Sequence, residues 1–217
     1  MLEDLTEKPE PLTARGRKTR RALLDAAKTV FSRDGFAGAR VTDIADEAGA
    51  AHGSFYRYFE SKEEILITLI REIEEILWHP GRETHQKHAD SVERQPDHVS
   101  HYEQINRTNL AYLQAYLNHK EMMLVWQEVA TLNPVVEEFR RVAMNRFSRR
   151  AANAIRTWQE EGSVDPAIDP DYVAPALTGM VSNFAYQWCN CNLNYDLDSA
   201  AEQLSIVWAN ALGLPRS

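Results

Sequence analysis

The chain has little of what disulfide-stabilised or membrane-spanning proteins contain. Only two of its 217 residues are cysteines, Cys189 and Cys191, and they are one residue apart. Such a pair cannot join distant parts of a fold, so we expect free thiols and a reducing compartment. No apolar run reaches the roughly 20 residues that span a bilayer, and no signal-peptide pattern is present. We therefore expect a soluble protein of the cytoplasm.

The sequence also lacks the short motifs of common enzyme families. It contains no Gly-x-Ser-x-Gly, His-Glu-x-x-His, P-loop or Gly-x-Gly-x-x-Gly stretch, and no spacing pairs a cysteine with a histidine. Nothing after Gly35 alternates between apolar and polar residues as a half-buried strand does, and there is no internal repeat. We therefore expect an all-α protein that is not an enzyme and needs no cofactor.

Charge is divided unevenly along the chain. The formal net charge is −8, yet residues 12–62 contain ten Lys and Arg against six Asp and Glu, while residues 63–217 contain thirteen against twenty-two. Five basic residues cluster near the start of the first expected helix: Arg15, Arg17, Lys18, Arg20 and Arg21. A basic end on an acidic body is typical of a protein that binds DNA phosphates. A solvated basic tail is the alternative.

Residues 42–62 are the most informative stretch of the chain. Thr42 is suited to cap a short helix, and Gly49 stands where a helix commonly ends in a left-handed residue. A second short helix and the capped start of a third follow. Short helices on either side of a glycine turn predict a helix-turn-helix, which presents its second helix to the DNA major groove.

The second short helix, over about residues 52–58, has an unusual composition for a core element. Phe55 and Phe59, four residues apart, can face inward. Gly53 leaves room for another backbone to approach closely. The outer face then consists of His52, Ser54, Tyr56, Arg57 and Tyr58. Exposed aromatic and hydroxyl side chains of this kind suit contacts with phosphates, thymine methyl groups and base edges.

Ser61-Lys62-Glu63-Glu64 is a capping box that opens the third helix. Lys62 stands at its first position, where the positive end of the helix dipole disfavours a cation. A DNA phosphate bound there would be held by the backbone amides and the ammonium together. A surface lysine beside an ordinary cap is the alternative.

The stretch from about residue 17 to residue 69 resembles the N-terminal domain of TetR-family transcriptional regulators. The resemblance has no gaps and rests on Leu23–Phe31, Asp34-Gly35-Phe36, Val41–Ala45, Gly49, Ser54–Phe59 and Ser61–Glu64. It covers about the first third of the chain, and the remainder is similar only in helical architecture and length. The resemblance implies DNA contacts by Thr42, His52, Gly53, Ser54, Tyr56, Tyr58 and Lys62. To these we add Arg17 from the basic cluster.

Helical periodicity continues to the end of the chain. Apolar stripes predict further helices over about 62–78, 101–118, 120–131, 133–161, 170–191 and 196–213. Asn133-Pro134, Asp169-Pro170 and Asp196 mark three of the starts. We expect about nine helices: a disordered tail over residues 1–12, a three-helix DNA-binding domain over 13–62, and a ligand-binding and dimerisation domain over 63–217.

The helix that ends near Cys191 is apolar on almost every side, so it needs cover from several directions. The last helix is similarly apolar. The family resemblance implies that these two helices pair with their symmetry mates in a homodimer, and we assign to that interface Val181, Phe184, Leu204 and Trp208. A central helix within a monomer is the alternative. A twofold dimer is what the recognition of two DNA half-sites requires.

Aromatic and methionine side chains recur along the middle helices. Such a stripe is most often ordinary core, but these side chains also line adaptable apolar pockets. The family resemblance implies a small, often hydrophobic effector in the C-terminal domain. We predict that its pocket is lined by Trp78, Tyr112, Tyr116, Trp126, Met144, Phe147, Asn183 and Trp188.

Two His-x-x-His pairs, His85/His88 and His98/His101, point to a different class of protein. Histidines three residues apart share a helical face and can bind Zn²⁺, Ni²⁺ or Cu²⁺. The surrounding residues are polar and poorly periodic, and they offer no shell around such a site. We therefore expect solvated histidines and no metal site.

Two classes of function follow. The favoured one is a dimeric DNA-binding regulator, in the simplest case a repressor that a small hydrophobic effector releases from its operator. The alternative is a helical protein that binds a metal or a small molecule and does not act on DNA.

Overall fold

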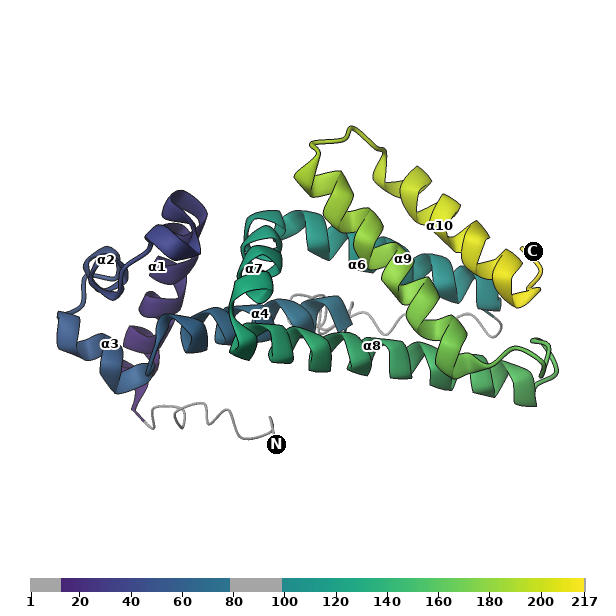
Figure 1. Cartoon of the computed structure of the whole chain (residues 1–217), viewed down its shortest axis with the longest axis horizontal. Coiled ribbons are helices and arrows are strands. Elements are labelled where there is room, and N and C mark those ends of the chain that lie inside the picture. Colours follow the sequence, from purple (N-terminus) through teal and green to yellow (C-terminus); the bar gives the residue numbers. More distant parts are fainter. Residues whose placement is uncertain (1–12, 79–98, 217) are drawn as a thin grey trace, which may run out of the picture. The chain divides into compact units, whose positions relative to one another are not determined.

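The computed structural model describes residues 13–78 and 99–216, which form nine α-helices and no strand (Figure 1). The helices are α1 (Ala14–Gly38), α2 (Val41–Glu47), α3 (His52–Tyr58), α4 (Lys62–Trp78), α6 (His101–Asn118), α7 (Lys120–Leu132), α8 (Pro134–Glu160), α9 (Pro170–Asn190) and α10 (Leu197–Leu212). The prediction of an all-α fold is confirmed. No helix in the described ranges is both long enough and apolar enough to cross a bilayer.

Capping residues predicted from the sequence begin the last helices. The Asp169 and Asp196 carboxylates accept hydrogen bonds of 2.9 Å from the backbone N–H groups of Asp171 and Ser199, and so satisfy donors that a helix start leaves unpaired. The bond from the Ser199 backbone lowers the pKa of Asp196. Both predicted starts are confirmed.

The turn between α2 and α3 has the geometry expected from its glycine. Gly49 is left-handed, with φ of 61°, and glycine adopts this conformation without the steric cost that other residues incur. The Ala50 N–H donates to Ala45 O at 2.9 Å, and the Gly49 N–H donates to Asp46 O at 3.0 Å. This pair of bonds is a Schellman motif, which ends α2 and sets the direction in which α3 begins.

The start of α2 differs from the prediction. The helix begins at Val41 with Arg40 as its N-cap, so Thr42 lies within the first turn and does not cap it. The Arg40 N–H donates to the Asp43 carboxylate at 3.2 Å. Because Asp43 satisfies this donor, the helix begins two residues earlier than a Thr42 cap would allow.

The chain divides into two compact units. The first contains the described residues up to Glu74 together with Glu121–Arg141, and the second contains the described residues of Glu75–Lys120 and those from Val142 onward. Both α4 and α8 begin in the first unit and continue into the second. The predicted functional boundary between residues 62 and 63 remains a prediction.

The first unit is built around fully buried side chains of α1 to α4 and of the α3–α4 connection: Leu23, Phe31, Ile44, Phe55, Phe59 and Ile65. Helix α7 and the start of α8 belong to the same unit. There the Trp126 and Phe139 rings lie 6.0 Å apart, and the Arg71 guanidinium lies 5.5 Å from the centre of the Phe139 ring. The unit therefore combines the helix-turn-helix with two later helices.

In the second unit, α6 packs against both α9 and α10. A buried hydrogen bond from Asn109 Nδ2 to Ser205 Oγ, 3.0 Å long, joins α6 to α10. Tyr112 of α6 stacks on Phe147 of α8 with ring centroids 5.6 Å apart. A buried polar pair of this kind holds α6 and α10 in one register, because breaking it leaves an unpaired group in the core.

Candidate DNA interface and ligand cavity

Helix α3 has a core-facing side and an exposed side. Phe55, and Phe59 just after the helix, are fully buried with ring centroids 5.8 Å apart. Tyr56 is 57% exposed although it is aromatic. The predicted division between inward and outward residues is confirmed, with His52, Gly53, Tyr56 and Arg57 exposed and Ser54 and Tyr58 half-buried. Buried phenylalanines thus anchor a short helix whose outer face is free of aliphatic side chains.

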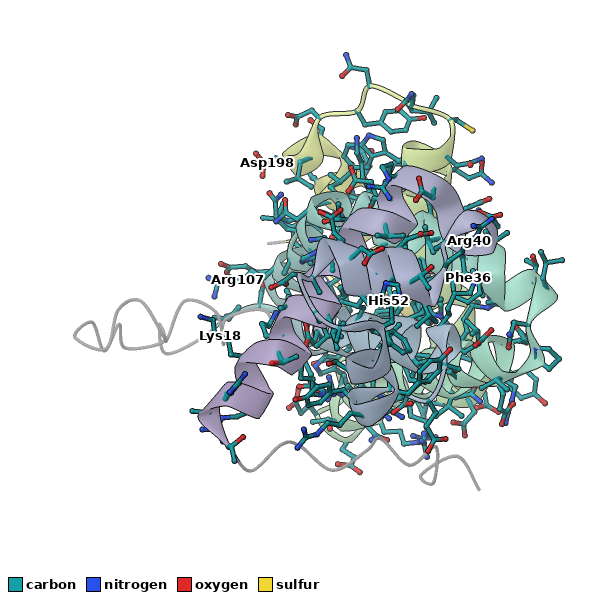
Figure 2. The ribbon with its side chains drawn as sticks, turned by 90° about the vertical axis from the view of Figure 1, so that its left-hand side faces the viewer. Lys18, Phe36, Arg40, His52, Arg107 and Asp198 are labelled. Atoms are coloured by element: carbon teal, nitrogen blue, oxygen red, sulfur yellow. The ribbon has the colours of Figure 1, made fainter. Side chains whose placement is uncertain are left out.

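His52 is tied to α2 across the turn. Its Nε2 lies 2.8 Å from Asp46 Oδ1, and both side chains are exposed. Figure 2 looks at the chain from the side of α2 and α3, with His52 labelled on the face toward the viewer. A hydrogen bond at one ring nitrogen fixes the orientation of an imidazole. Asp46 therefore directs the opposite edge of the His52 ring, which carries Nδ1, away from α2.

Lys62 serves the fold in a way that the sequence did not indicate. Its Nζ donates hydrogen bonds to Phe36 O at 2.9 Å and Ala39 O at 2.7 Å, and lies 4.7 Å from the centre of the Phe36 ring. Helix α1 has no basic residue in its own last turn, so Lys62 supplies the cation that a helix C-terminus favours. The phosphate contact of Lys62 stays a prediction, and a positioning role is added to it.

The Ser61 half of the predicted capping box over Ser61–Glu64 is confirmed. Ser61 Oγ accepts a hydrogen bond of 3.2 Å from the Glu64 N–H. The Glu64 carboxylate in turn accepts from the backbone N–H of Glu60, one residue before the expected donor. These bonds fix the first turn of α4 and hence the position from which Lys62 reaches α1.

Gly53 is not required by the fold. It lies within α3, its φ is not positive, and a Cβ built on it would meet no protein atom within 4 Å. Glycine costs about 0.5–1 kcal/mol relative to alanine inside a helix. A glycine that the protein interior does not need is consistent with close approach by something outside the chain.

Three further residues are exposed at the starts of α1 and α2. Arg17 and Thr42, both predicted DNA contacts, are exposed on the first turns of α1 and α2. Arg40, which the sequence reasoning missed, is exposed at the N-cap of α2 and labelled in Figure 2. Its place directly before the helix-turn-helix was the signal that could have identified it.

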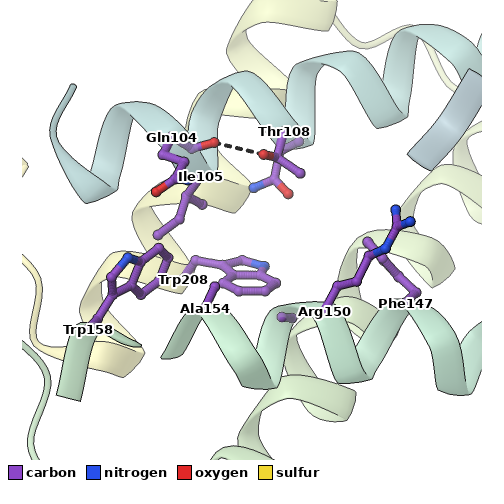
Figure 3. A pocket seen from close by; sticks show the side chains of 10 residues that line it. Gln104, Ile105, Thr108, Phe147, Arg150, Ala154, Trp158 and Trp208 are labelled. Carbon is purple, nitrogen blue, oxygen red and sulfur yellow. Dashed lines mark hydrogen bonds between the residues drawn. The ribbon is translucent and has the colours of Figure 1, made fainter. Parts of the chain in front are cut away.

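A cavity of about 200 Å³ lies between α6 and α8 in the second unit (Figure 3). It is lined by Gln104, Ile105, Thr108, Asn109, Phe147, Arg150, Ala151, Ala154, Trp158 and Trp208. In Figure 3, Trp158 and Arg150 lie toward opposite ends of this space, and the Trp208 indole lies between α6 and α8. The Trp208 indole nitrogen is buried and has no hydrogen-bond partner among the described residues.

Phe147 is the one predicted ligand-binding residue that lines this cavity. Trp126 packs on Phe139 in the first unit instead, and Asn183 is exposed on α9. Met144 is half-buried and Trp188 is buried, but neither lines the cavity. The ligand contacts predicted for these four residues remain predictions. The side chain of Trp78 lies outside the described part of the structure.

Tyr112 and Tyr116 form an aromatic wall beside the cavity without lining it. Their rings lie 6.0 Å apart, and Tyr112 stacks on Phe147. Burial raises the pKa of both hydroxyls, and a hydrogen bond with Ser182 opposes this effect at Tyr112. Both hydroxyls are therefore neutral at physiological pH, and Tyr112 packs directly on Phe147.

The cavity could have been found from the spacing of α8. Phe147, Ala151, Ala154 and Trp158 recur at intervals of four, three and four residues, which places them on one helix face. Two alanines between two large aromatic side chains leave a hollow in that face. The sequence reasoning counted the aromatic residues and missed the alanines.

The predicted dimer interface needs a correction. Val181, Leu204 and Trp208 are buried within the protomer, so they are covered before any partner arrives. Phe184 is half-buried and stacks on Tyr195 at 5.3 Å. The exposed apolar side chains of this region are instead Tyr172, Leu193, Tyr195 and Val207. Periodicity identified apolar helices but not which of their faces the protomer itself covers.

The predicted histidine pairs lie mostly outside the described residues. Of these four histidines the structure describes His101, whose Nε2 lies 3.2 Å from Glu161 Oε2 and whose ring lies 4.9 Å from that of Trp158. Within residues 13–78 and 99–216, no group of three or more His, Cys, Asp or Glu is placed to hold a metal ion.

Comparisons with known proteins agree with this arrangement. Residues 23–69 match the family model of bacterial regulatory proteins of the tetR family. The chain is 44% identical to the fatty acid metabolism regulator protein of Bacillus subtilis over 50 residues, 23% of this chain and 26% of that protein. It is 26% identical to the transcriptional repressor KstR2 of Rhodococcus jostii over 93% of this chain and 94% of that one.

The whole fold has solved counterparts. Bacillus subtilis FadR, solved in complex with stearoyl-CoA, superposes with a TM-score of 0.68 and 18% identity over 86% of this chain and 96% of FadR. The likeness therefore extends beyond the helix-turn-helix to both units. By its N-terminal sequence, its helix-turn-helix and its overall fold, the chain belongs to the TetR family of bacterial transcriptional regulators.

Proposed function

We propose that the chain is a homodimeric repressor that binds operator DNA through α3 and leaves it when a small molecule occupies the cavity between α6 and α8. The outer face of α3 carries this proposal, because His52, Gly53, Tyr56 and Arg57 are exposed over a fully buried Phe55. The exposed side chains of α3 do not contribute to the core of the protein. We place this activity in the cytoplasm, because that is where bacterial DNA is located.

The DNA contacts divide by chemistry. We propose that Arg17, Thr42, Tyr58 and Lys62 bind phosphates, which positions the protein without reading sequence. His52, Gly53, Ser54 and Tyr56 meet base edges, because they lie at the start and on the exposed side of α3. The excess of basic residues over residues 12–62 adds an electrostatic attraction to the DNA backbone, which weakens as the salt concentration rises.

We propose a dimer interface on the exposed apolar side chains of α9 and α10. Tyr172 is 78% and Val207 is 46% exposed in the protomer, and obligate interfaces bury about 2,000 Å² or more. Val207→Glu should yield monomers in sedimentation experiments. Leu132→Glu is the control, since Leu132 is 82% exposed in the first unit. If both changes altered the oligomeric state equally, the assignment of the interface to α9 and α10 would be refuted.

The response to ligand is proposed to pass through α4. This helix starts at Lys62 in the first unit and continues past Glu74 into the second. A ligand that favours a different α4 orientation would change the spacing of two recognition helices from the roughly 34–36 Å of one DNA turn. Couplings of this kind are typically about 1–3 kcal/mol, or about 5- to 150-fold in affinity.

Fluorescence anisotropy with DNA from upstream of the chain's own gene tests the proposal. We expect a specific complex that survives excess unrelated DNA and weakens steeply between low and high salt. His52→Ala should change which DNA sequence is preferred, whereas Arg17→Ala should weaken binding to all DNA sequences by a similar factor. If unrelated competitor DNA abolished binding at every salt concentration, operator recognition would be refuted. The alternative, a protein that binds small molecules without acting on DNA, would then be favoured.

A further inference from the structure

The orientation of His52 depends on one neighbouring side chain. Its Nε2 lies 2.8 Å from Asp46 Oδ1, and the residues that the structure describes offer its Nδ1 no hydrogen-bond partner. The His52 side chain is 59% exposed and lies on the face toward the viewer in Figure 2. A molecule outside the chain can therefore reach the free Nδ1.

The Asp46 carboxylate decides which nitrogen of His52 carries the hydrogen. An ionised carboxylate can only accept hydrogen bonds, so Nε2 is the donor in this contact. In a neutral imidazole the other nitrogen then has a lone pair and no hydrogen. An isolated histidine has both tautomers available, whereas the contact with Asp46 selects one of them. The neutral His52 ring is thereby fixed as a hydrogen-bond acceptor at Nδ1.

Asp46 differs from the other carboxylates of α2, which bind within the first helices. Asp43 accepts the hydrogen bond that caps α2, and Glu47 lies 3.6 Å from Arg33 of α1. Asp46 instead meets a side chain at the start of α3, and its own side chain is 68% exposed. Exposed pairs of this kind contribute little to stability. The contact therefore matters more for the orientation of His52 than for the fold.

The start of the second helix is where helix-turn-helix proteins read DNA bases. The N-terminal residues of this helix contact base edges in the major groove, and His52 is the first residue of α3. The hydrogen-bond donors in that groove are the exocyclic amines of adenine and cytosine, whereas the N7, O6 and O4 atoms of the bases are acceptors. An acceptor at Nδ1 of His52 therefore matches an exocyclic amine.

We propose that Asp46 is a positioning residue that fixes His52 as a hydrogen-bond acceptor, so that His52 reads the exocyclic amine of one adenine or cytosine in each half-site. This inference rests on the proposed function, because it requires that α3 enters the major groove of operator DNA. It adds the chemical group that His52 recognises and assigns a specificity role to a residue of α2.

The contact is tested at the operator base pair whose preference changes in His52→Ala. One set of operator duplexes carries N6-methyladenine or N4-methylcytosine at this pair. Such a methyl group removes the donor hydrogen from the major groove and leaves Watson–Crick pairing in place. A second set carries a 7-deazapurine, which lacks the N7 acceptor. Fluorescence anisotropy titrations are run at about pH 8.5, above the range in which histidines ordinarily titrate.

We expect methylation to weaken binding by the wild-type protein about 2- to 12-fold, which corresponds to the loss of one hydrogen bond. The 7-deazapurine should leave its affinity unchanged, and His52→Ala should bind modified and unmodified duplexes alike. Asp46→Asn should lose most of the methylation effect, because an amide can donate to Nε2 as well as accept from it and so no longer selects one tautomer. Glu47→Gln removes the same charge from an exposed position of the same helix and should retain the full effect.

An unchanged methylation effect in Asp46→Asn would overturn the proposal, and so would an effect of the 7-deazapurine in place of methylation. A methylation effect that persists in His52→Ala would also overturn it, since another residue would then read the amine. In each of these cases specific operator binding by the wild-type protein remains, so the proposed function stands. If the wild-type protein recognises no operator at all, the proposed function and this inference fail together.

Discussion

Replacing Lys62 by methionine separates two roles that one side chain can have. The ammonium of Lys62 donates to Phe36 O and Ala39 O, at 2.9 and 2.7 Å, and lies over the Phe36 ring. Methionine keeps much of the length and apolar character of the side chain but removes the charge and both donors. A residue that only contacted DNA phosphate would leave the free protein unaffected by this change.

The geometry sets the size of the effect. Hydrogen bonds that involve a charged group contribute about 1.5–3 kcal/mol each, and a cation over an aromatic ring adds about 0.5–1 kcal/mol at an exposed site. Lys62 is half-buried, so water replaces part of these contacts when they are lost. We expect a net loss of about 2 kcal/mol, which lowers the unfolding midpoint of a chain of this size by about 4–8 °C.

Calorimetric unfolding of the free protein measures this loss directly. Lys18→Met is the matched control, because Lys18 is an exposed lysine on α1 of the same unit, and it should shift the midpoint by less than about 2 °C. The affinity of the Lys62→Met variant for DNA should also fall, and by the same factor for operator and unrelated sequences. A variant with wild-type midpoint and weakened DNA binding would refute the positioning role and leave the phosphate contact alone.

Three further changes test other parts of the account. Gly53→Ala should raise the unfolding free energy by about 0.5–1 kcal/mol in chemical denaturation while weakening operator binding; a gain in both would show that DNA does not approach this backbone. Ala154→Leu should fill the cavity and lower the calorimetric affinity of a ligand that occupies it, whereas Thr157→Leu, exposed on the same helix, should not. Asp196→Ala should lower the melting temperature at pH 7. Because folding lowers the pKa of Asp196 through the Ser199 backbone bond, its contribution is present above about pH 4 and lost as the pH falls through the lower folded value, so melting curves of the two proteins should converge in acid.

Local rules predicted the framework of this fold well. Caps at Asp169 and Asp196, the left-handed Gly49 and the inward Phe55 and Phe59 follow from sequence because each depends on a few neighbouring residues. The start of α2 was misplaced because two capping solutions compete there, and the Asp43 side chain decided between them.

Helix rotation and long-range pairing were beyond sequence reasoning. Trp208 was expected on a dimer surface, yet it lines the cavity, because its neighbour α6 covers that face of α10. Lys62 reaches carbonyls 23 and 26 residues away in the chain, a contact that no local pattern encodes. Both outcomes depend on which faces meet, whereas hydrophobic periodicity reports only that an apolar face exists.

Selection of binding sites from random duplex DNA is the most direct measurement of the central claim. We expect the wild-type protein to enrich an inverted repeat and bind it at least about a thousandfold more tightly than unrelated DNA. The His52→Ala variant should enrich a different repeat with the same spacing between half-sites, since the dimer that sets this spacing is unchanged. Failure of the wild-type protein to enrich any sequence, or identical repeats for both proteins, would contradict the claim that α3 reads operator DNA.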